Sequence, residues 1–246
     1  MKLCELMLRE YDVKVSPAMP TSDMYGRLSK GTGEFIGQGK FADVYGNDTN
    51  PHDVMKISKS QDQIGHSSLD VDGYTAFLQA IANDKEMQDN PHFPRIRQVR
   101  MDKDNKQFQA RVERLTPLQK LSPRELYELI RRYWPTAESK LKYLQGHVKL
   151  IKNSDKEDLR DRVENFQTSA ENSIVDLVQA TYNGNTQSSY KELNTALDWL
   201  YATGHNTNFQ PDLHRFNIMI RRSNTGNTLV LNDPLGYPNI NMRNDQ

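Results

Sequence analysis

The chain has 246 residues and a mass of 28.4 kDa, enough for one large domain or two small ones with a buried core. Its 32 basic and 32 acidic side chains balance, so it lacks the positive excess typical of proteins that bind nucleic acids or anionic membranes. The single cysteine, Cys4, excludes an internal disulfide and a thiolate metal cluster and favours a reducing compartment. No run of about 18 apolar residues occurs and acidic residues interrupt the N-terminus, so we expect a soluble, cytoplasmic protein without a signal peptide.

Short alternating segments predict a β-rich region over residues 33–115. Strands are predicted at 35–47 and 52–58, joined by the turn-prone sequence Asn-Asp-Thr-Asn-Pro. Apolar residues at helical spacing predict a helix over 69–82, and 95–115 predicts a hairpin with Asp-Lys-Asp-Asn at its turn. The first 30 residues carry no informative pattern.

Residues 122–203 change to a charged sequence with helical periodicity. Ser122 and Glu125 form a capping-box pattern before a helix that Pro135 ends. A second helix is predicted over 137–151, where apolar residues again recur at helical spacing.

Two further helices complete this helical block. Apolar residues spaced three and four apart predict one long amphipathic helix from 155 to about 182. A second capping-box pattern, Ser189 with Glu192, predicts a last helix that Gly204 ends.

The pattern becomes β again after Gly204. Residues 216–222 and 228–233 flank Ser-Asn-Thr-Gly-Asn, a strong hairpin signal. A β-rich segment, a helical block and a final hairpin together predict an α+β fold. We place the division between an N-terminal part, 1–115, and a mainly helical part, 116–246.

The glycine-containing segment from Gly37 to Val44 lies on the first predicted hairpin. Two glycines one residue apart let the backbone approach a triphosphate and turn its N–H groups toward the oxygens. A dinucleotide-binding loop needs a helix directly after it, and a strand is predicted instead. A plain hairpin turn remains the alternative interpretation.

Lys56 lies within the apolar sequence Val-Met-Lys-Ile of the next predicted strand. A lysine at such a position needs an anionic partner for its ammonium group, such as a phosphate. The alternative is a surface lysine that extends its charged end into water.

The sharpest signal is the segment Asp-Leu-His-Arg-Phe-Asn from Asp212 to Asn217. An Asp and an Asn five residues apart on a loop can serve as a base and a metal ligand. Asp233 ends the following apolar strand and could hold a Mg²⁺ that bridges phosphates, so we expect Asn217 and Asp233 to meet in one cleft. The alternatives are a polar loop with local Asx hydrogen bonds, in which His214 is only partly exposed, and an Asp-Pro turn at 233.

In order, secondary structure and spacing, these four features resemble the eukaryotic-type protein kinase family. The resemblance is strongest to the early serine/threonine protein kinases of short-tailed lytic bacteriophages, and it is carried by the segments FIGQGKFADVY, VMKIS, GYTAF, DLHRFNIM and LNDPLG. It implies a bilobal protein-kinase-like fold. The N-lobe would be β-rich, and the truncated, mainly helical C-lobe would end in a β-hairpin.

The resemblance implies ATP and Mg²⁺ as cofactors and gives each motif a role. Lys56 would hold the α- and β-phosphates, Asp212 would take the acceptor proton, and Asn217 and Asp233 would bind the metal. The segment 112–115 resembles the strand between lobes that holds the adenine. The nucleotide-binding set that the resemblance implies comprises Gly37, Gln38, Gly39, Lys40, Phe41, Ala42, Val44, Lys56, Asp70, Glu113 and Leu115.

The sequence departs from the family pattern at several positions. Ala42 replaces the third loop glycine, Gln210 replaces a histidine before the base, and Pro234 replaces a phenylalanine. The acidic partner of Lys56 would be Asp70, with Asp72 as the fallback, although the family has a longer glutamate there. Too few residues follow the last motif for an ordinary activation segment, so the helical block would have to supply any surface for the substrate.

The implied partners are proteins of an infected bacterium, modified at serine or threonine in its cytoplasm, or the protein itself. No direct nucleic-acid or membrane partner is expected, and the sequence leaves the oligomeric state open. Two alternatives stay open. One is a kinase-fold binding protein that inhibits or redirects a host factor without phosphoryl transfer. The other is a small-molecule kinase resembling aminoglycoside phosphotransferases.

Overall fold

A computed structural model describes residues 14–19, 32–38, 42–59, 73–102, 108–152, 156–207 and 209–238. The fold is mixed α+β, as predicted, with a β-rich N-terminal sheet and a helical C-terminal part. The chain divides into two compact units. The first contains residues 1–114, 207–210 and 235–246, and the second contains residues 115–206 and 211–234.

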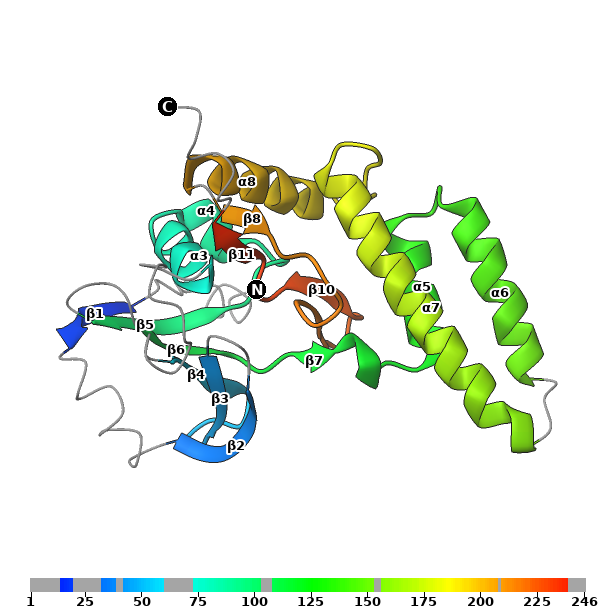
Figure 1. The fold of residues 1–246 in the computed structure, drawn as a ribbon, viewed down its shortest axis with the longest axis horizontal. Helices are drawn as coiled ribbons and strands as arrows, with labels where there is room; N and C mark the ends of the chain where they lie inside the picture. The colour runs from blue at the N-terminus through cyan, green and yellow to red at the C-terminus, as the bar shows by residue number, and fades with distance from the viewer. Residues whose placement is uncertain are drawn as a thin grey trace, which may run out of the picture. The chain divides into compact units, whose positions relative to one another are not determined.

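A six-stranded sheet forms the centre of the first unit, in the order β1-β5-β6-β4-β3-β2 (Figure 1). Neighbouring strands pair antiparallel, except that β1 runs parallel to β5. The six strands are β1 Lys14–Met19, β2 Thr32–Gln38, β3 Ala42–Asn47, β4 Asp53–Ser58, β5 Ile96–Asp102 and β6 Phe108–Glu113.

Two sequence predictions in this unit differ from the structure or extend beyond the described residues, and one strand was not predicted. The single strand predicted at 35–47 is wrong, because β2 ends at Gln38 and β3 begins at Ala42, and the two pair as a hairpin. The hairpin predicted at 95–115 is confirmed by β5 and β6, although most of its predicted turn lies outside the described residues. The strand β1 is an addition to the prediction.

Helix α3, Gly73–Ala82, packs against the sheet and is followed by the short helix α4, Lys85–Asp89. The ring of Tyr74 lies 5.2 Å from that of Phe108 on β6, and Phe77 is fully buried. A Cβ atom on Gly73 would collide with the backbone carbonyls of the strand β11, Leu235–Pro238, so glycine is needed where α3 meets that strand. The helix predicted from residue 69 begins at Gly73 within the described residues.

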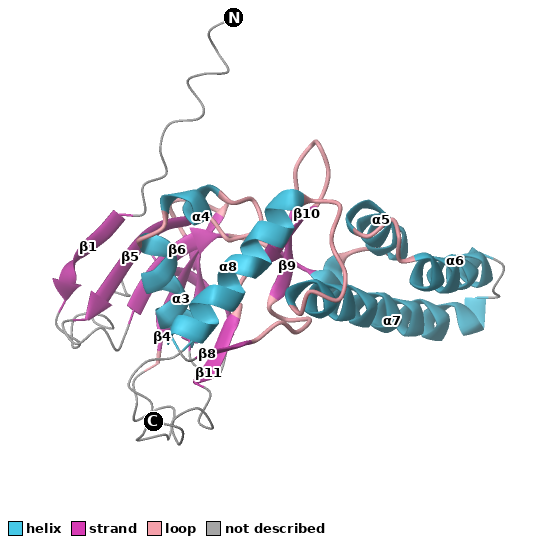
Figure 2. Cartoon of the chain, turned by 90° about the horizontal axis from the view of Figure 1, so that it is seen from above, coloured by secondary structure: helices cyan, strands magenta, loops and turns pink. Residues whose placement is uncertain are grey.

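Four helices make up most of the second unit, and α5 and α6 pack side by side against the long helix α7 (Figures 1 and 2). The Trp134 indole, fully buried, donates from Nε1 to Oγ1 of Thr181 at 3.0 Å and so ties the end of α5 to α7. None of the described helices has the length and apolarity of a bilayer span. The four helices are α5 Pro123–Tyr133, α6 Glu138–Lys152, α7 Lys156–Tyr182 and α8 Lys191–Thr207.

The two predicted capping boxes have different outcomes. Ser122 and Glu125 exchange both capping hydrogen bonds at the start of α5, which confirms the first. The hydroxyl of Ser189 instead donates to backbone carbonyls of Arg132 and Tyr133, at 2.7 and 3.2 Å, and α8 begins at Lys191. The second prediction is therefore wrong, because the end of α5 is a better partner for this hydroxyl.

The predicted end of α8 at Gly204 is also wrong, since the helix continues to Thr207. Gly204 is buried inside the last turns of the helix. A glycine signals a helix end only where the chain takes a left-handed conformation, whereas a buried glycine within a helix lets another segment approach closely.

The hairpin predicted at 216–233 is confirmed by β9, Ile218–Arg221, and β10, Thr228–Leu231, which pair antiparallel. The short strand β7, Thr116–Pro117, adds to the other edge of β9, and the 3₁₀ helix η2, Leu118–Lys120, follows it. A separate pair joins β8, Phe209–Pro211, to β11. The hairpin is therefore not the last element of the fold.

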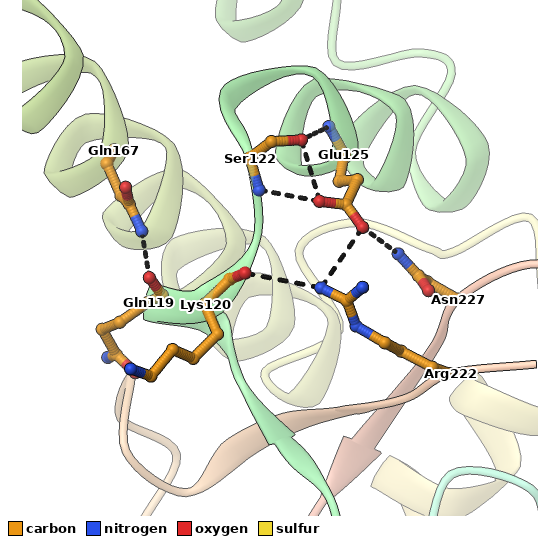
Figure 3. A network of polar contacts seen from close by, with 7 residues as sticks. All are labelled: Gln119, Lys120, Ser122, Glu125, Gln167, Arg222 and Asn227. Carbon is orange, nitrogen blue, oxygen red and sulfur yellow. Dashed lines mark hydrogen bonds and ion pairs between the residues drawn. The ribbon is translucent and has the colours of Figure 1, made fainter.

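A polar network anchors this hairpin to the start of α5 (Figure 3). The carboxylate of Glu125 lies 3.4 Å from the guanidinium of Arg222 and accepts from the amide of Asn227 at 3.5 Å. Arg222 also donates to the carbonyl of Lys120 at 3.4 Å. Because both ends of the hairpin turn are tied to the same capping box, the strands β9 and β10 are held at a fixed place in the second unit.

Candidate functional site

The loop between β8 and β9 presents polar side chains on a fixed backbone. Leu213 and Ile218 are buried at its two ends, while the residues between them are exposed or half-buried. The side chain of Gln179 on α7 donates to the carbonyl of Leu213 at 2.9 Å, and the Asn217 N–H donates to the carbonyl of His214 at 2.9 Å. The apolar residues therefore anchor the loop and leave its polar groups accessible.

Three backbone or amide hydrogen bonds gather Asp212, Asn217 and Asp233 into one site of the second unit. The side-chain amide of Asn217 donates to the carbonyl of Asp212 at 2.9 Å. The residues on either side of Asp233 both contact the loop, since Asn232 donates to the Asn217 carbonyl and the Pro234 carbonyl accepts from Asp212, each at 2.8 Å. The segment that carries Asp233 thus lies alongside the loop that carries the other two.

The groups around Asp212 change how tightly its carboxyl group holds a proton. Burial raises the pKa of Asp212, and the nearby charge of Asp233 raises it further. The imidazole of His214 and the amide of Asn217 act in the opposite direction. Asp212 therefore holds a proton more tightly than an ordinary aspartate, and a cation placed between the two carboxylates would relieve their repulsion.

His214 is a site residue to which the sequence analysis gave no role. Its Nδ1 accepts from the Phe216 N–H at 3.2 Å, and its Nε2 lies 3.4 Å from Oδ1 of Asp212. A neutral imidazole that accepts at Nδ1 carries its proton on Nε2, which here faces the carboxylate. The spacing Asp-x-His was the only signal for this contact in the sequence.

The oxygen atoms of this site suit Mg²⁺ better than a softer metal. Asn217 donates through its nitrogen, so the amide oxygen is left to face a cation, and carboxylates are the hard ligands that Mg²⁺ prefers. Within the described ranges no group of three or more His, Cys, Asp or Glu side chains has metal-binding geometry. A Mg²⁺ ion held by these side chains would have to complete its octahedral shell with water or other oxygen ligands.

In the first unit, Lys56 lies in the middle of the sheet and is nearly buried, with 8% of its surface exposed. The pairing register places it opposite Val44 on one side and Ala110 on the other. Its Nζ lies 3.3 Å from the centre of the Tyr74 ring on α3. This cation–π contact helps to hold the ammonium in the interior, and the sequence analysis gave Tyr74 no role in the site.

Most of the other predicted nucleotide-binding residues of the first unit belong to the hairpin of β2 and β3. Gly37 pairs with Val44, Gln38 pairs with Asp43, and Ala42 is buried at the start of β3. A Cβ atom on Gly37 would meet no heavy atom of the described residues within 4 Å, so these residues leave open space beside this glycine. Four predicted residues and the fallback partner of Lys56 lie outside the described residues, namely Gly39, Lys40, Phe41, Asp70 and Asp72.

The segment predicted to hold the adenine lies where the chain passes from the first unit to the second. Glu113 belongs to the first unit and Leu115 to the second. The N–H groups of Glu113 and Arg114 already donate to carbonyls, at 3.0 Å to Arg95 and 2.7 Å to His52. The Glu113 carboxylate accepts from the Arg95 N–H at 2.9 Å, so this side chain closes the end of the sheet.

The predicted site residues therefore form two groups in separate units. Lys56 and the glycine-containing hairpin belong to the first, and Asp212, Asn217 and Asp233 belong to the second. Comparison of the sequence with protein-family models and with curated proteins finds no match.

Proposed function

We propose that the protein is an ATP- and Mg²⁺-dependent serine/threonine protein kinase of bacteriophage type, with the bilobal kinase-like fold that the sequence resemblance implies. The observation that carries the proposal is the gathering of Asp212, Asn217 and Asp233 by short hydrogen bonds of their loop. A base, an amide oxygen and a carboxylate at one place form the set that phosphoryl transfer needs.

Asp212 acts as the base of the proposed reaction. Its carboxylate takes the proton from a serine or threonine hydroxyl while that oxygen forms a bond to the γ-phosphorus and the bond from phosphorus to the ADP oxygen breaks. Because burial raises the pKa of Asp212, the carboxylate binds this proton more readily than an exposed aspartate does. His214, 3.4 Å from the carboxylate, fixes its orientation.

The other groups bind and orient the nucleotide. Asn217 and Asp233 hold Mg²⁺, which when bound neutralises charge on the phosphate oxygens. The Asn217 amide is fixed by its bond to the Asp212 carbonyl, so its oxygen needs no reorientation to ligate the ion. Lys56 holds the α- and β-phosphates, and the open side of Gly37 lets the backbone approach them.

The proposed acceptors are proteins of an infected bacterium, or the protein itself, in the bacterial cytoplasm. This part of the proposal rests on the resemblance to the bacteriophage kinases. Its chemical support is that Asp212, with 42% of its side chain exposed, is accessible to a hydroxyl on a protein surface.

A second candidate is a kinase-fold protein that binds and redirects a host factor without phosphoryl transfer. It is favoured by the hydrogen bonds of Glu113 and Arg114, whose N–H groups are already satisfied where a kinase presents backbone donors to the adenine. The two candidates differ in whether Asp212 is needed for a chemical reaction.

Transfer of label from γ-³²P-ATP tests the proposal. The purified protein, mixed with Mg²⁺ and a bacterial lysate, should label itself or lysate proteins, and Asp212→Asn should abolish the labelling. The matched control is Asp198→Asn, which removes an exposed carboxylate from α8 and should label like the wild type. Labelling that survives Asp212→Asn would exclude Asp212 as the base, and no labelling by the wild type would favour the binding protein.

A further inference from the structure

A groove of about 580 Å³ runs along one face of α7 in the second unit. Its floor is a row of side chains at steps of four residues, so they follow one another along the helix. At a rise of about 1.5 Å per residue the row is roughly 18 Å long. From the apolar to the polar end, the row is Leu159, Val163, Gln167 and Glu171.

The polar end of the groove contains a buried carboxylate. Glu171 is only 2% exposed, and its carboxylate accepts a long hydrogen bond, 3.4 Å from the amide of Gln119, while the side-chain amide of Gln167 is also close to it. The cation whose charge acts on this carboxylate is Arg215, through longer-range attraction. Burying this carboxylate is costly, because glutamine amides and the distant charge of Arg215, rather than a contacting cation, replace the water that it loses.

The groups around Glu171 are held in place and are polar. Gln167 donates from Nε2 to the carbonyl of Gln119 at 2.6 Å, which fixes the wall between η2 and α7 (Figure 3). Burial raises the pKa of Glu171, while Gln167 and the charge of Arg215 lower it. The site is therefore a preformed acceptor for a cation that approaches the carboxylate more closely than Arg215 does.

We propose that this groove docks an extended segment of the acceptor protein, with a lysine or arginine on Glu171 and an apolar residue four positions away on Val163. The spacing comes from the helix, because eight residues of α7 cover about 12 Å and four residues of an extended chain cover about the same distance. Residues four apart in an extended chain also point to the same side. That the docked segment belongs to an acceptor of the phosphoryl group rests on the proposed kinase function. That the groove binds a basic and an apolar side chain does not depend on that function.

The groove also reaches the loop that carries the proposed base. Arg215 lines it and lies three residues after Asp212 on that loop. Its guanidinium lies 4.8 Å from the ring of Phe216 and attracts Glu171 from a distance. A docked segment would therefore be held beside the loop, which raises the local concentration of its hydroxyl groups near Asp212.

Peptide binding measured by fluorescence anisotropy, without nucleotide, tests the inference. The probe is a fluorescein-labelled nine-residue peptide of glycine and serine with one arginine and a leucine four positions after it. Replacing Glu171→Gln should weaken binding roughly tenfold to a hundredfold, because a charge-assisted hydrogen bond is lost from a buried site. Asp161→Asn, which removes an exposed carboxylate of α7 outside the groove, should leave binding unchanged.

Changes in the peptide keep the test decisive if Glu171→Gln does not fold. Replacing the arginine of the peptide with glutamine should weaken its binding to the wild-type protein by the same factor as Glu171→Gln does. Moving the leucine to the next position should weaken binding several-fold. Equal affinity for the arginine and glutamine peptides, or no binding of either, would overturn the proposal. Peptide binding without any phosphoryl transfer would contradict the kinase function alone, and phosphoryl transfer without peptide binding would contradict the groove alone.

Discussion

Replacing Tyr133 by phenylalanine removes one buried hydroxyl between α5 and the hairpin that leads to Asp233. Tyr133 is 1% exposed, and its hydroxyl accepts from the N–H of Leu229 on β10 at 3.1 Å. Burial raises the pKa of this phenol to about 12, so it stays neutral and protonated across the accessible pH range. The ring itself stacks on Tyr190 at 4.4 Å, and phenylalanine keeps that contact.

The expected loss of stability comes from the N–H group of Leu229, which loses the Tyr133 hydroxyl as its acceptor. A buried backbone N–H that loses its acceptor costs about 1–3 kcal/mol, whereas the ring volume is nearly unchanged and no cavity forms. For a chain of this length, about 2 kcal/mol corresponds to a fall in the melting temperature of roughly 4–8 °C. The amide of Leu229 should also exchange with solvent faster than in the wild type.

Circular dichroism during thermal unfolding measures the first effect and hydrogen exchange the second. Tyr143→Phe is the matched control, because Tyr143 is 53% exposed on α6 and its change should shift the melting temperature by less than 2 °C. If Tyr133→Phe melts at the same temperature as the wild type, the Tyr133 hydroxyl does not help to hold β10 against α5.

Three further outcomes are expected. Ser122→Ala should destabilise the protein by about 1 kcal/mol in urea unfolding, because α5 loses its capping box, and an unchanged midpoint would contradict this. Burial raises the pKa of Glu171, so its contribution to stability is full below the ordinary value of 4.5 and is lost as the pH rises through the higher folded value. Glu171→Gln should flatten the dependence of stability on pH above 4.5, and an unaltered profile would argue against a buried carboxylate. Lys56→Met should leave the melting temperature within about 3 °C, because methionine is similar in length to the lysine stem and can fill the same nearly buried space, yet abolish stabilisation by ATP, and retained stabilisation would remove Lys56 from the nucleotide site.

Elements that depend on neighbouring residues were predictable from the sequence. The capping box at Ser122 needs only Glu125, three residues later, and the turn between β9 and β10 needs only its own five residues. Both therefore appear in the structure where the pattern put them. Helical periodicity likewise found α5, α6 and α7, because their buried faces repeat at regular spacing.

Elements that depend on distant residues were not predictable. The hydroxyl of Ser189 fits a capping box equally well on paper, but the carbonyls of Arg132 and Tyr133 are brought to it only by folding. The strand β1 has no informative pattern of its own and is defined by its parallel pairing with β5. Neither the bonding of Ser189 nor the pairing of β1 can be predicted from the residues next to them in the sequence.

In the candidate site, too, the features that depend on neighbouring residues were predictable and those that depend on distant residues were not. The residue types and their order pointed to Asp212, Asn217 and Asp233, but the hydrogen bonds that bring Asp233 to the loop join distant segments. Glu171 gave no signal at all, because a glutamate on a charged helix is normally exposed. Its burial comes from Gln119 and the packing around it, which only the folded chain supplies.

The claim on which the account depends is that Asn217 and Asp233 hold Mg²⁺ together with a nucleotide. Thermal unfolding with ATP alone, and with ATP and Mg²⁺, tests it in the wild type, in Asp233→Ala and in the control Asp198→Ala. We expect added Mg²⁺ to raise the melting temperature of the wild type and the control beyond the effect of ATP alone, and to leave Asp233→Ala unchanged. If Mg²⁺ stabilises Asp233→Ala as much as the wild type, Asp233 is not a metal ligand and its Asp-Pro sequence is only a turn.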